Sequence, residues 1–398
     1  MSNRSSESRF LLQLKWIEQG CSKIKHFVCT TFLTETKELL RTGWVLSVFM
    51  LLEYSLLTTS VVFCGRLGQR EMAAAALTQS IISILCFMPG YGMVTVCNTY
   101  FAAGFGSTDG QKQETILQKS LILSGLVSLL CWALLINTES ILRLLQQEES
   151  IVLMVGVLVR AYLPAVPAVF ASFVLSRFLQ CRNHEMITMV AMVVAAVVNI
   201  LLNYLFVIVM KGGASWSFGA VVIAQYIDLF ILSAYVYKYE DFKGWTTESL
   251  DDWYEFSVIG INGCLMIELG IIIFEAGYLF CGTIDDLAMD VFGAVYIILF
   301  YTFMICSGLS AALAIRIGQS LGKNDPDTAK VSMQVAFVSC WIYAVIVSCL
   351  LFGFRNYIGY LFTDDRAIVD GIADIASVII IYEISDMTGV CTINQCIC

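Results

Sequence analysis

Six carboxyl side chains lie inside long apolar stretches of the sequence, where a charged group is costly to bury and marks a functional position by default. They are Glu53, Asp228, Glu268, Glu275, Glu383 and Asp386. Two pairs among these six residues have helical spacing. Glu268 and Glu275 are seven residues apart and share one helix face, and Glu383 and Asp386, three residues apart, share another. The spacing predicts that the two carboxyl groups of each pair project from one stripe of their helix.

The low-dielectric interior favours the neutral form of a carboxyl group. A group that binds either a proton or another cation, but not both, couples the fluxes of the two by competition. Glu268 and the Glu383/Asp386 pair lie deep in their stretches and are candidates for this role, together with Glu275. Glu275 lies near the outer end of its stretch, so contact with water is the alternative explanation of its charge.

Glu53 and Asp228 have a second explanation. Both are compatible with interior groups that bond to a neighbouring helix, and this interpretation is at least as good as a role in ion exchange. Arg160 is a candidate counter-ion for them, because it also lies inside an apolar stretch.

The composition places the whole chain in a lipid bilayer. Of its 398 residues only 14% are charged and 58% are hydrophobic, and the mean hydropathy is +0.79. A soluble domain is about a quarter charged, so this chain lacks the polar surface that would cover a globule in water. Two histidines, with no glycine-rich phosphate loop or serine nucleophile motif, predict neither an enzyme nor a metal or cofactor site. No block of charge suggests nucleic-acid binding.

Ten apolar stretches are long enough to cross the bilayer as helices, since about 20 residues span its hydrocarbon core. Their limits are 43–64, 73–103, 116–137, 152–179, 186–210, 216–237, 256–281, 287–314, 331–354 and 368–393. Sixteen lysines and arginines precede the first stretch or lie in even-numbered loops, against six in odd-numbered loops. Positively charged loops stay in the cytosol, so we expect a multi-pass membrane protein with a cytosolic N-terminus.

An internal repeat appears when the chain is shifted by 217 residues, which places Gly65 on Gly282. Duplicated lobes are typical of transporters, and chance register of similar helices is the alternative. The polar, basic start of the chain predicts a cytosolic segment over residues 1–42, and the repeat predicts a first lobe of six spans over 43–252 and a second lobe over 253–398. This second lobe has four spans, so by symmetry we expect that its last two are missing.

Six motifs carry a resemblance to a known family. They are Phe63-Cys-Gly-Arg-Leu-Gly68, Tyr162-Leu-Pro-Ala-Val-Pro167, Arg177-Phe-Leu-Gln180, Asn199-Ile-Leu-Leu-Asn-Tyr204, Gln225-Tyr226 and Ile317-Gly-Gln-Ser-Leu-Gly322. In this order and spacing they resemble the eukaryotic multidrug and toxin extrusion (MATE) family. The resemblance implies two six-helix bundles around a central cavity, in the plasma membrane. It also implies export of organic cations or other xenobiotics, driven by a proton gradient and by no cofactor, with a carboxylate network in the second lobe.

The sequence departs from the family at some of these carboxylates. Without gaps, the family's seventh-helix glutamate falls on Gly270, two residues after Glu268, and its eighth-helix glutamate falls on Ile297. A shift of two residues turns a side chain by about 200° around a helix. The tenth-helix acid matches Glu383 or Asp386 only within a few residues.

Seven further residues are candidates for lining a cavity or for packing helices together, and packing is favoured. They are Asn98, Pro164, Pro167, Asn199, Asn203, Gln225 and Tyr226. The prolines free backbone carbonyls and bend the fourth span, and the two asparagines of the fifth span share a helix face. Gly90, Gly92 and Gly308 are predicted to interrupt the second and eighth spans.

Two functional hypotheses follow. The leading one is a proton-coupled exporter of organic cations. The competing one is a truncated, non-transporting membrane protein that associates with a full-length sibling. Proton-driven flux of an organic cation, or its absence, separates the two.

Overall fold

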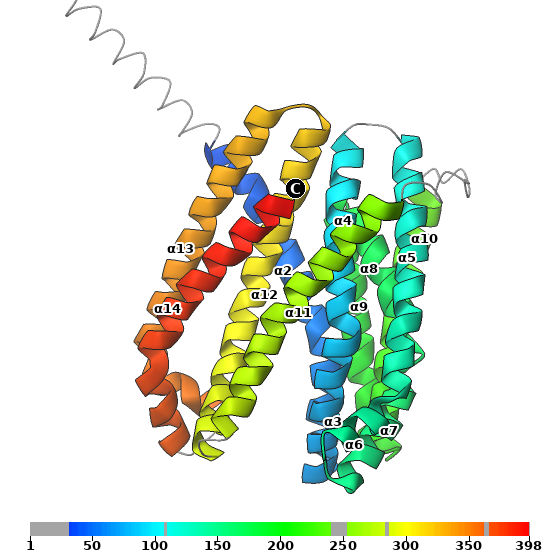
Figure 1. Ribbon diagram of the computed structural model, residues 1–398, viewed down its shortest axis with the longest axis vertical. Coiled ribbons are helices and arrows are strands. Elements are labelled where there is room, and N and C mark those ends of the chain that lie inside the picture. The colour runs from blue at the N-terminus through cyan, green and yellow to red at the C-terminus, as the bar shows by residue number, and fades with distance from the viewer. Residues whose placement is uncertain (1–31, 107–109, 240–252, 283–285, 362–365, 398) are drawn as a thin grey trace, which may run out of the picture.

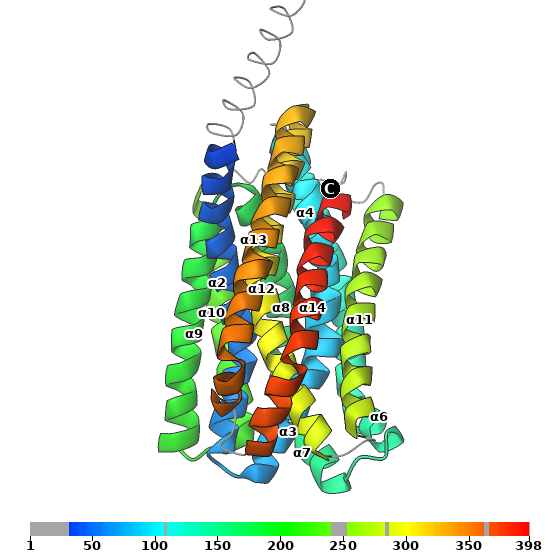
Figure 2. The same ribbon diagram turned by 90° about the vertical axis from the view of Figure 1, so that its left-hand side faces the viewer.

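The computed structural model describes residues 32–106, 110–239, 253–282, 286–361 and 366–397. Every regular element within these ranges is helical. The long helices lie side by side in one elongated bundle (Figures 1 and 2). The prediction of an all-α membrane protein is therefore confirmed.

Sixteen helical segments make up the described chain. In order they are α2 (Leu33–Gly65), α3 (Gln69–Ile82), the π-helix η2 (Ser83–Phe87), α4 (Met88–Gly106), α5 (Gly110–Ile136), α6 (Thr138–Leu144), α7 (Glu149–Tyr162), α8 (Ala165–Cys181), α9 (Glu185–Asn203), the π-helix η3 (Tyr204–Val209), α10 (Ala214–Tyr239), α11 (Trp253–Gly282), α12 (Asp286–Gly322), α13 (Pro326–Ile358), the 3-10 helix η5 (Gly359–Leu361) and α14 (Arg366–Ile397).

Seven of the described helical stretches are long and apolar enough to cross a membrane, and eight when α7 and α8 are counted as one broken span. Two more long helices, α11 and α14, lie beside them in the bundle (Figure 2). Each of the ten predicted stretches thus corresponds to a helical segment. Apolar length alone predicts these segments, because a helix in lipid must satisfy all its backbone groups internally.

The helix ends recur at the predicted offset. α2 ends at Gly65 and α11 at Gly282, and α7 begins at Glu149 and α14 at Arg366, so both pairs are 217 residues apart. We call α2 to α10 the first half and α11 to α14 the second half. The repeat in the sequence is therefore also a repeat of helix boundaries.

Two ends of the bundle serve as reference points. The upper end in Figure 1 carries the start of α2 and the α12–α13 turn, and the lower end carries the α2–α3 turn and α6. The ribbons of α11 and α12 diverge from α3 toward the lower end. The tight contacts between the halves lie away from it.

Glycines make these tight contacts between the halves, which we call the glycine seam. Its members are Gly43, Gly92, Gly106, Gly308 and Gly318. A β-carbon added at Gly106 would lie 2.9 Å from Cα of Gly322, and one added at Gly308 would lie 2.5 Å from Cα of Ser47. The two halves therefore touch backbone to backbone, as small residues permit in membranes.

Gly90, Gly92 and Gly308 do not interrupt their helices, so that prediction is wrong. α4 and α12 run unbroken through them, and the irregular turn of the second span is instead the π-helix Ser83–Phe87. The close approach of Cys264 to Gly92 explains why a residue of low helix propensity occupies that position.

Candidate functional site

Glu383 of α14 is a fully buried carboxylate without a hydrogen-bond donor among the described residues. Its polar neighbours are Thr302 of α12 and Asp386. The Thr302 hydroxyl donates to the carbonyl of Leu299 at 2.9 Å, within its own helix. The hydroxyl of Tyr343 on α13 donates to the carbonyl of Thr302 at 3.1 Å. Three helices of the second half thus enclose Glu383; the Thr302 hydroxyl lies close enough to interact with it, but its hydrogen bonds of normal geometry go to carbonyls of its own helix.

Asp386 lies one helical turn after Tyr382, whose hydroxyl is its polar neighbour. The predicted pair is therefore brought together in the second half, because Glu383 and Asp386 also lie close enough to interact electrostatically. Asp386 is half-buried, whereas Glu383 is fully buried. Two acids of unequal environment in one site can hold one shared cation or proton.

Glu268 and Glu275 lie on α11, but their side chains fall outside the part of the chain that the structure describes. Their predicted role in proton or substrate coupling stays a prediction. Ile297, the position of the family's eighth-helix glutamate, has an exposed side chain on α12.

The first half contains its own buried acids, Glu53 of α2 and Asp228 of α10. The hydroxyl of Tyr91 donates to Glu53 at 2.8 Å, and the Arg177 guanidinium lies within electrostatic range. Asp228 is fully buried, and neither of its oxygens accepts a hydrogen bond from a described residue. Glu53 thus fits the interpretation of an interior group bonded to a neighbouring helix. For Asp228, whose polar neighbour is Ser172 of α8, that interpretation stays a prediction.

Arg160 is not the counter-ion of these acids. Its side chain is 60% exposed near the lower end, where it lies 2.6 Å from Glu139 of α6. In the same cluster Arg143 donates to Glu149 at 2.9 Å, and these bonds lower the pKa of Glu149. Apolar neighbours in the sequence suggested burial, but α6 packs on α7 and supplies an acid that the spacing did not reveal.

The two asparagines of α9 join three helices. Asn199 donates to the carbonyl of Leu56 on α2 at 3.0 Å, and Asn203 donates to the carbonyl and side-chain oxygens of Asn199, also at 3.0 Å. Ser217 of α10 donates to the side-chain oxygen of Asn203 and approaches Ser60 on α2. These amides are fully buried and committed to packing within the first half.

The prolines of the fourth span produce a 52° bend between α7 and α8. Pro167 lacks the N–H that would bond the carbonyl of Leu163, and the indole of Trp132 on α5 donates to that carbonyl at 2.7 Å. The hydroxyl of Tyr226 on α10 donates to the carbonyl of Pro164 at 3.0 Å. A neighbouring helix thus supplies a donor to the carbonyl that Pro167 leaves free, beside the 3.2 Å bond from the Val166 N–H, as lipid requires, and Tyr226 adds a contact from α10.

Asn98 and Gln225 are both buried in the first half. The side-chain oxygen of Asn98 accepts no hydrogen bond from a described residue, and the thiol of Cys181 approaches its backbone carbonyl at 4.0 Å. Asn98 is therefore a polar group that has room for a further partner, whereas the asparagines of α9 do not.

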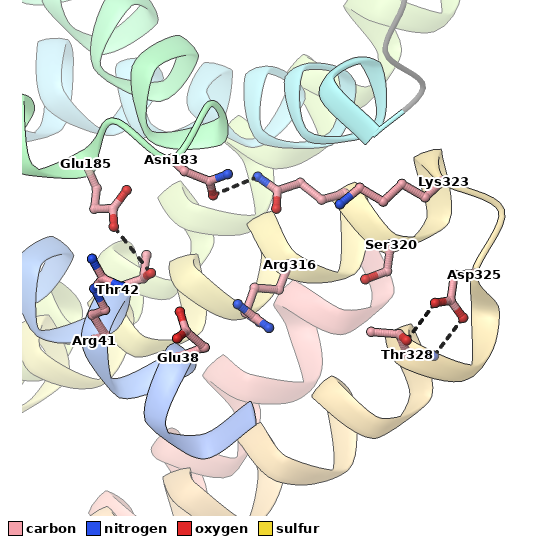
Figure 3. Close-up of a pocket in the computed structure, with 11 residues that line it drawn as sticks. Glu38, Arg41, Thr42, Asn183, Glu185, Arg316, Ser320, Lys323, Asp325 and Thr328 are labelled. Carbon is pink, nitrogen blue, oxygen red and sulfur yellow. Dashed lines mark hydrogen bonds between the residues drawn. The ribbon is translucent and has the colours of Figure 1, made fainter. Parts of the chain in front are cut away.

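A polar pocket of about 410 Å³ lies between the halves at the upper end (Figure 3). The start of α2, the α8–α9 turn, the end of α12 and the start of α13 form its walls. Its lining residues are Glu38, Arg41, Thr42, Asn183, Glu185, Arg316, Gln319, Ser320, Lys323, Asp325 and Thr328. Asp325 caps α13 by accepting from the Thr328 N–H at 3.1 Å, and hydrogen bonds from Thr328 lower its pKa.

Sequence reasoning missed the polar contacts between the halves beside this pocket. Arg316 of α12 donates to Glu35 of α2 at 2.7 Å, and Gln319 donates to the carbonyl of Cys181 at 2.6 Å. Gln319 belongs to a recognised motif, but Glu35 was assigned to the terminal segment before the first span. α2 begins at Leu33, ten residues before the predicted span, and only that extension brings Glu35 to α12.

The family model for MatE matches residues 46–205 and 264–395, which is most of the chain. The chain belongs to the MatE family. Solved structures of MATE transporters share its fold: the eukaryotic MATE transporter AtDTX14 is 21% identical, with a TM-score of 0.85 over 92% of this chain and 83% of that chain. A MATE transporter solved in an outward-facing conformation is 16% identical, with a TM-score of 0.79 over 91% of this chain and 82% of that one.

Relatives of this MatE chain include vertebrate multidrug and toxin extrusion proteins. Multidrug and toxin extrusion protein 1 of Oryctolagus cuniculus is 30% identical over 378 residues, which cover 93% of this chain. The Homo sapiens and Danio rerio proteins of the same name are 29% and 28% identical over 88% and 89% of this chain. The chain spans only 61% to 66% of the length of these three relatives.

Proposed function

We propose that this chain is a secondary active antiporter that exports organic cations or other xenobiotics in exchange for protons. The observation that carries the proposal is Glu383, a buried carboxylate with no donor to either oxygen among the described residues. An uncompensated charge in this environment is strongly destabilised, and either a proton or a cationic ligand relieves it. Membership of the MatE family and the printed names of the relatives support export as the outcome.

Competition at the α14 carboxylates supplies the coupling. A proton that enters from outside neutralises the Glu383/Asp386 pair and displaces a bound organic cation. Loss of that proton on the other side restores the charge and the affinity for the next cation. Because one site cannot hold both ligands at once, each cycle exchanges a proton for an organic cation. Glu268 and Glu275 on α11 belong to the same proposed coupling set.

The proposed orientation places the upper end in the cytosol. Its support is the excess of lysine and arginine in the N-terminal segment and the even-numbered loops. The proposed lobes cover residues 43–252 and 253–398, with the Glu383/Asp386 pair in the second. The plasma membrane is the proposed location, because a proton gradient there can drive export without any cofactor.

The test is flux into vesicles that contain the purified protein. With an imposed pH gradient, we expect the vesicles to move a fluorescent organic cation against its gradient, and Glu383→Gln to abolish this flux. Glutamine keeps the shape of the side chain but cannot exchange a proton. The matched control is Glu149→Gln, which removes an exposed glutamate at the lower end. Full flux in Glu383→Gln would refute the carboxylate mechanism.

Absence of flux in the wild-type protein would refute the antiporter itself, provided that the protein elutes as a single folded species. Stable co-purification with a longer MatE relative would then support the competing hypothesis of a non-transporting partner. Flux by the chain alone, without any such relative, would refute that alternative.

A further inference from the structure

The contacts of Glu35 differ from those of the glycine seam, because they are ionic and lie at the upper extremity of both halves. Arg316 donates to one Glu35 oxygen through two nitrogens, at 2.7 and 3.1 Å. Ser332 of α13 donates to the same oxygen at 3.2 Å. One carboxylate of the first half thus binds two helices of the second half.

Gln319 adds a second polar contact one helical turn further along α12. It donates to the carbonyl of Cys181 at 2.6 Å and to the side-chain oxygen of Asn183 at 3.2 Å. The Cys181 carbonyl lies in the last turn of α8, where carbonyls lack partners in their own helix. Asn183 has a positive φ of 62°, which closes the helix and leaves its amide facing α12. A side chain of the second half therefore caps a helix of the first half.

The burial of these groups suits a contact that opens and closes. The side chains of Glu35 and Arg316 are 16% and 25% exposed. A fully exposed ion pair contributes little, and a fully buried one is very costly to separate. The adjacent polar pocket, with the charged side chains of Lys323 and Glu38 in its walls, offers a polar environment to groups that separate.

We propose that Glu35, Arg316 and Gln319 form a latch that holds the upper ends of the two halves together and must release before the bundle opens on that side. The latch rests on the proposed function for its purpose, because a carrier must open on each side in turn. Its location follows from the contacts alone. The glycine seam supplies close packing along the halves, and the latch supplies the polar contacts that water can replace.

The test measures opening directly, by the alkylation rates of native cysteines in the protein in lipid nanodiscs, read by mass spectrometry. Two reporters lie near the latch or the seam: Cys181, whose carbonyl accepts from Gln319, and Cys306, next to the carbonyl of Ile305 that accepts from Ser47. Both are buried. Cys64, buried at the lower end of α2, is the internal control.

Glu35→Gln weakens a charge-assisted bond, so we expect alkylation of Cys181 and Cys306 to rise about tenfold while Cys64 is unchanged. Glu149→Gln is the matched control variant, because it breaks an Arg–Glu pair of similar geometry within the first half. The exchanged variant, Glu35→Arg with Arg316→Glu, should restore an ion pair at this position and lower the alkylation rates again. If Glu35→Gln acted only by disturbing the local packing, the second substitution would not lower them.

Unchanged rates in Glu35→Gln would overturn the latch, as would an equal rise at Cys64, which indicates general unfolding. Failure of the exchanged variant to improve on the single variant would also overturn it. These rates do not depend on transport. A latch that opens in a protein without proton-driven flux would therefore refute the proposed function and leave the latch standing.

Discussion

Replacement of Gly308 by alanine tests the glycine seam most directly. A β-carbon at this position would lie 2.5 Å from Cα of Ser47 and still closer to the Ser47 amide nitrogen and hydroxyl oxygen. Because two of these three atoms are backbone, no rotation of a side chain relieves the contact. α2 and α12 would have to separate by about 1 Å to restore normal packing.

The expected cost has three parts. Overpacking of this kind destabilises by about 1–3 kcal/mol. Separation also weakens the bond from the Ser47 hydroxyl to the carbonyl of Ile305, now 2.7 Å, at about 1 kcal/mol. Alanine regains up to about 1 kcal/mol of helix propensity. We therefore expect Gly308→Ala to lower the free energy of unfolding by about 1–3 kcal/mol.

The assay is unfolding in mixed micelles with a rising fraction of sodium dodecyl sulfate. Gly353→Ala on α13 is the matched control, because a β-carbon there meets no atom within 4 Å. It should stabilise the protein by about 0.4–1 kcal/mol through helix propensity and a less flexible unfolded chain. If Gly308→Ala were as stable as Gly353→Ala, the glycines would not be contact positions and the seam would be wrong.

Three more predictions follow from the polar contacts. Asn203→Ala should cost about 1–3 kcal/mol in the same assay, because it removes the donor to the side-chain oxygen of Asn199 and the acceptor of the Ser217 hydroxyl. Asn137→Ala, at an exposed position, should cost less than about 0.5 kcal/mol. Trp132→Phe should cost about 1 kcal/mol and speed hydrogen exchange around the bend, since the Leu163 carbonyl loses its 2.7 Å bond and keeps the 3.2 Å bond from the Val166 N–H. Unchanged exchange there would contradict this. Arg143 lowers the pKa of Glu149, so the stabilisation from this pair should persist at neutral pH and disappear as the pH falls below about 4. At that acidic pH the free energies of unfolding of Glu149→Gln and the wild type should converge. A difference that grows in acid would have the wrong sign.

The sequence predicts the long helices well because lipid imposes a minimum apolar length on each. The stretch 216–237 became α10, Ala214–Tyr239, and 331–354 became α13, Pro326–Ile358. Helix ends outside the apolar core are not visible to this signal. The ten residues that start α2, seven of them polar, are helical where α2 packs on α12, and hydropathy carries no information about that contact.

Of the candidate site, sequence spacing predicts proximity only within one helix. Glu383 and Asp386 lie together because three residues separate them. The contact of Glu35 with Arg316 joins residues 281 positions apart, and no periodicity encodes it. A glycine in an apolar stretch can mark either a break in the helix or a close contact with another helix. The sequence does not distinguish the two, because the difference depends on the neighbouring helix, and the break predicted at Gly308 proved to be a contact.

The bend between α7 and α8 has a mechanical consequence. Both carbonyls at the bend are held by side chains from other helices, the indole of Trp132 and the phenol of Tyr226. Straightening the bend would remove a side-chain donor from each of these carbonyls within the membrane. The hydrogen bonds at the bend therefore join α5, α8 and α10. We expect the first half to move as a rigid body in which the 52° angle between α7 and α8 does not change.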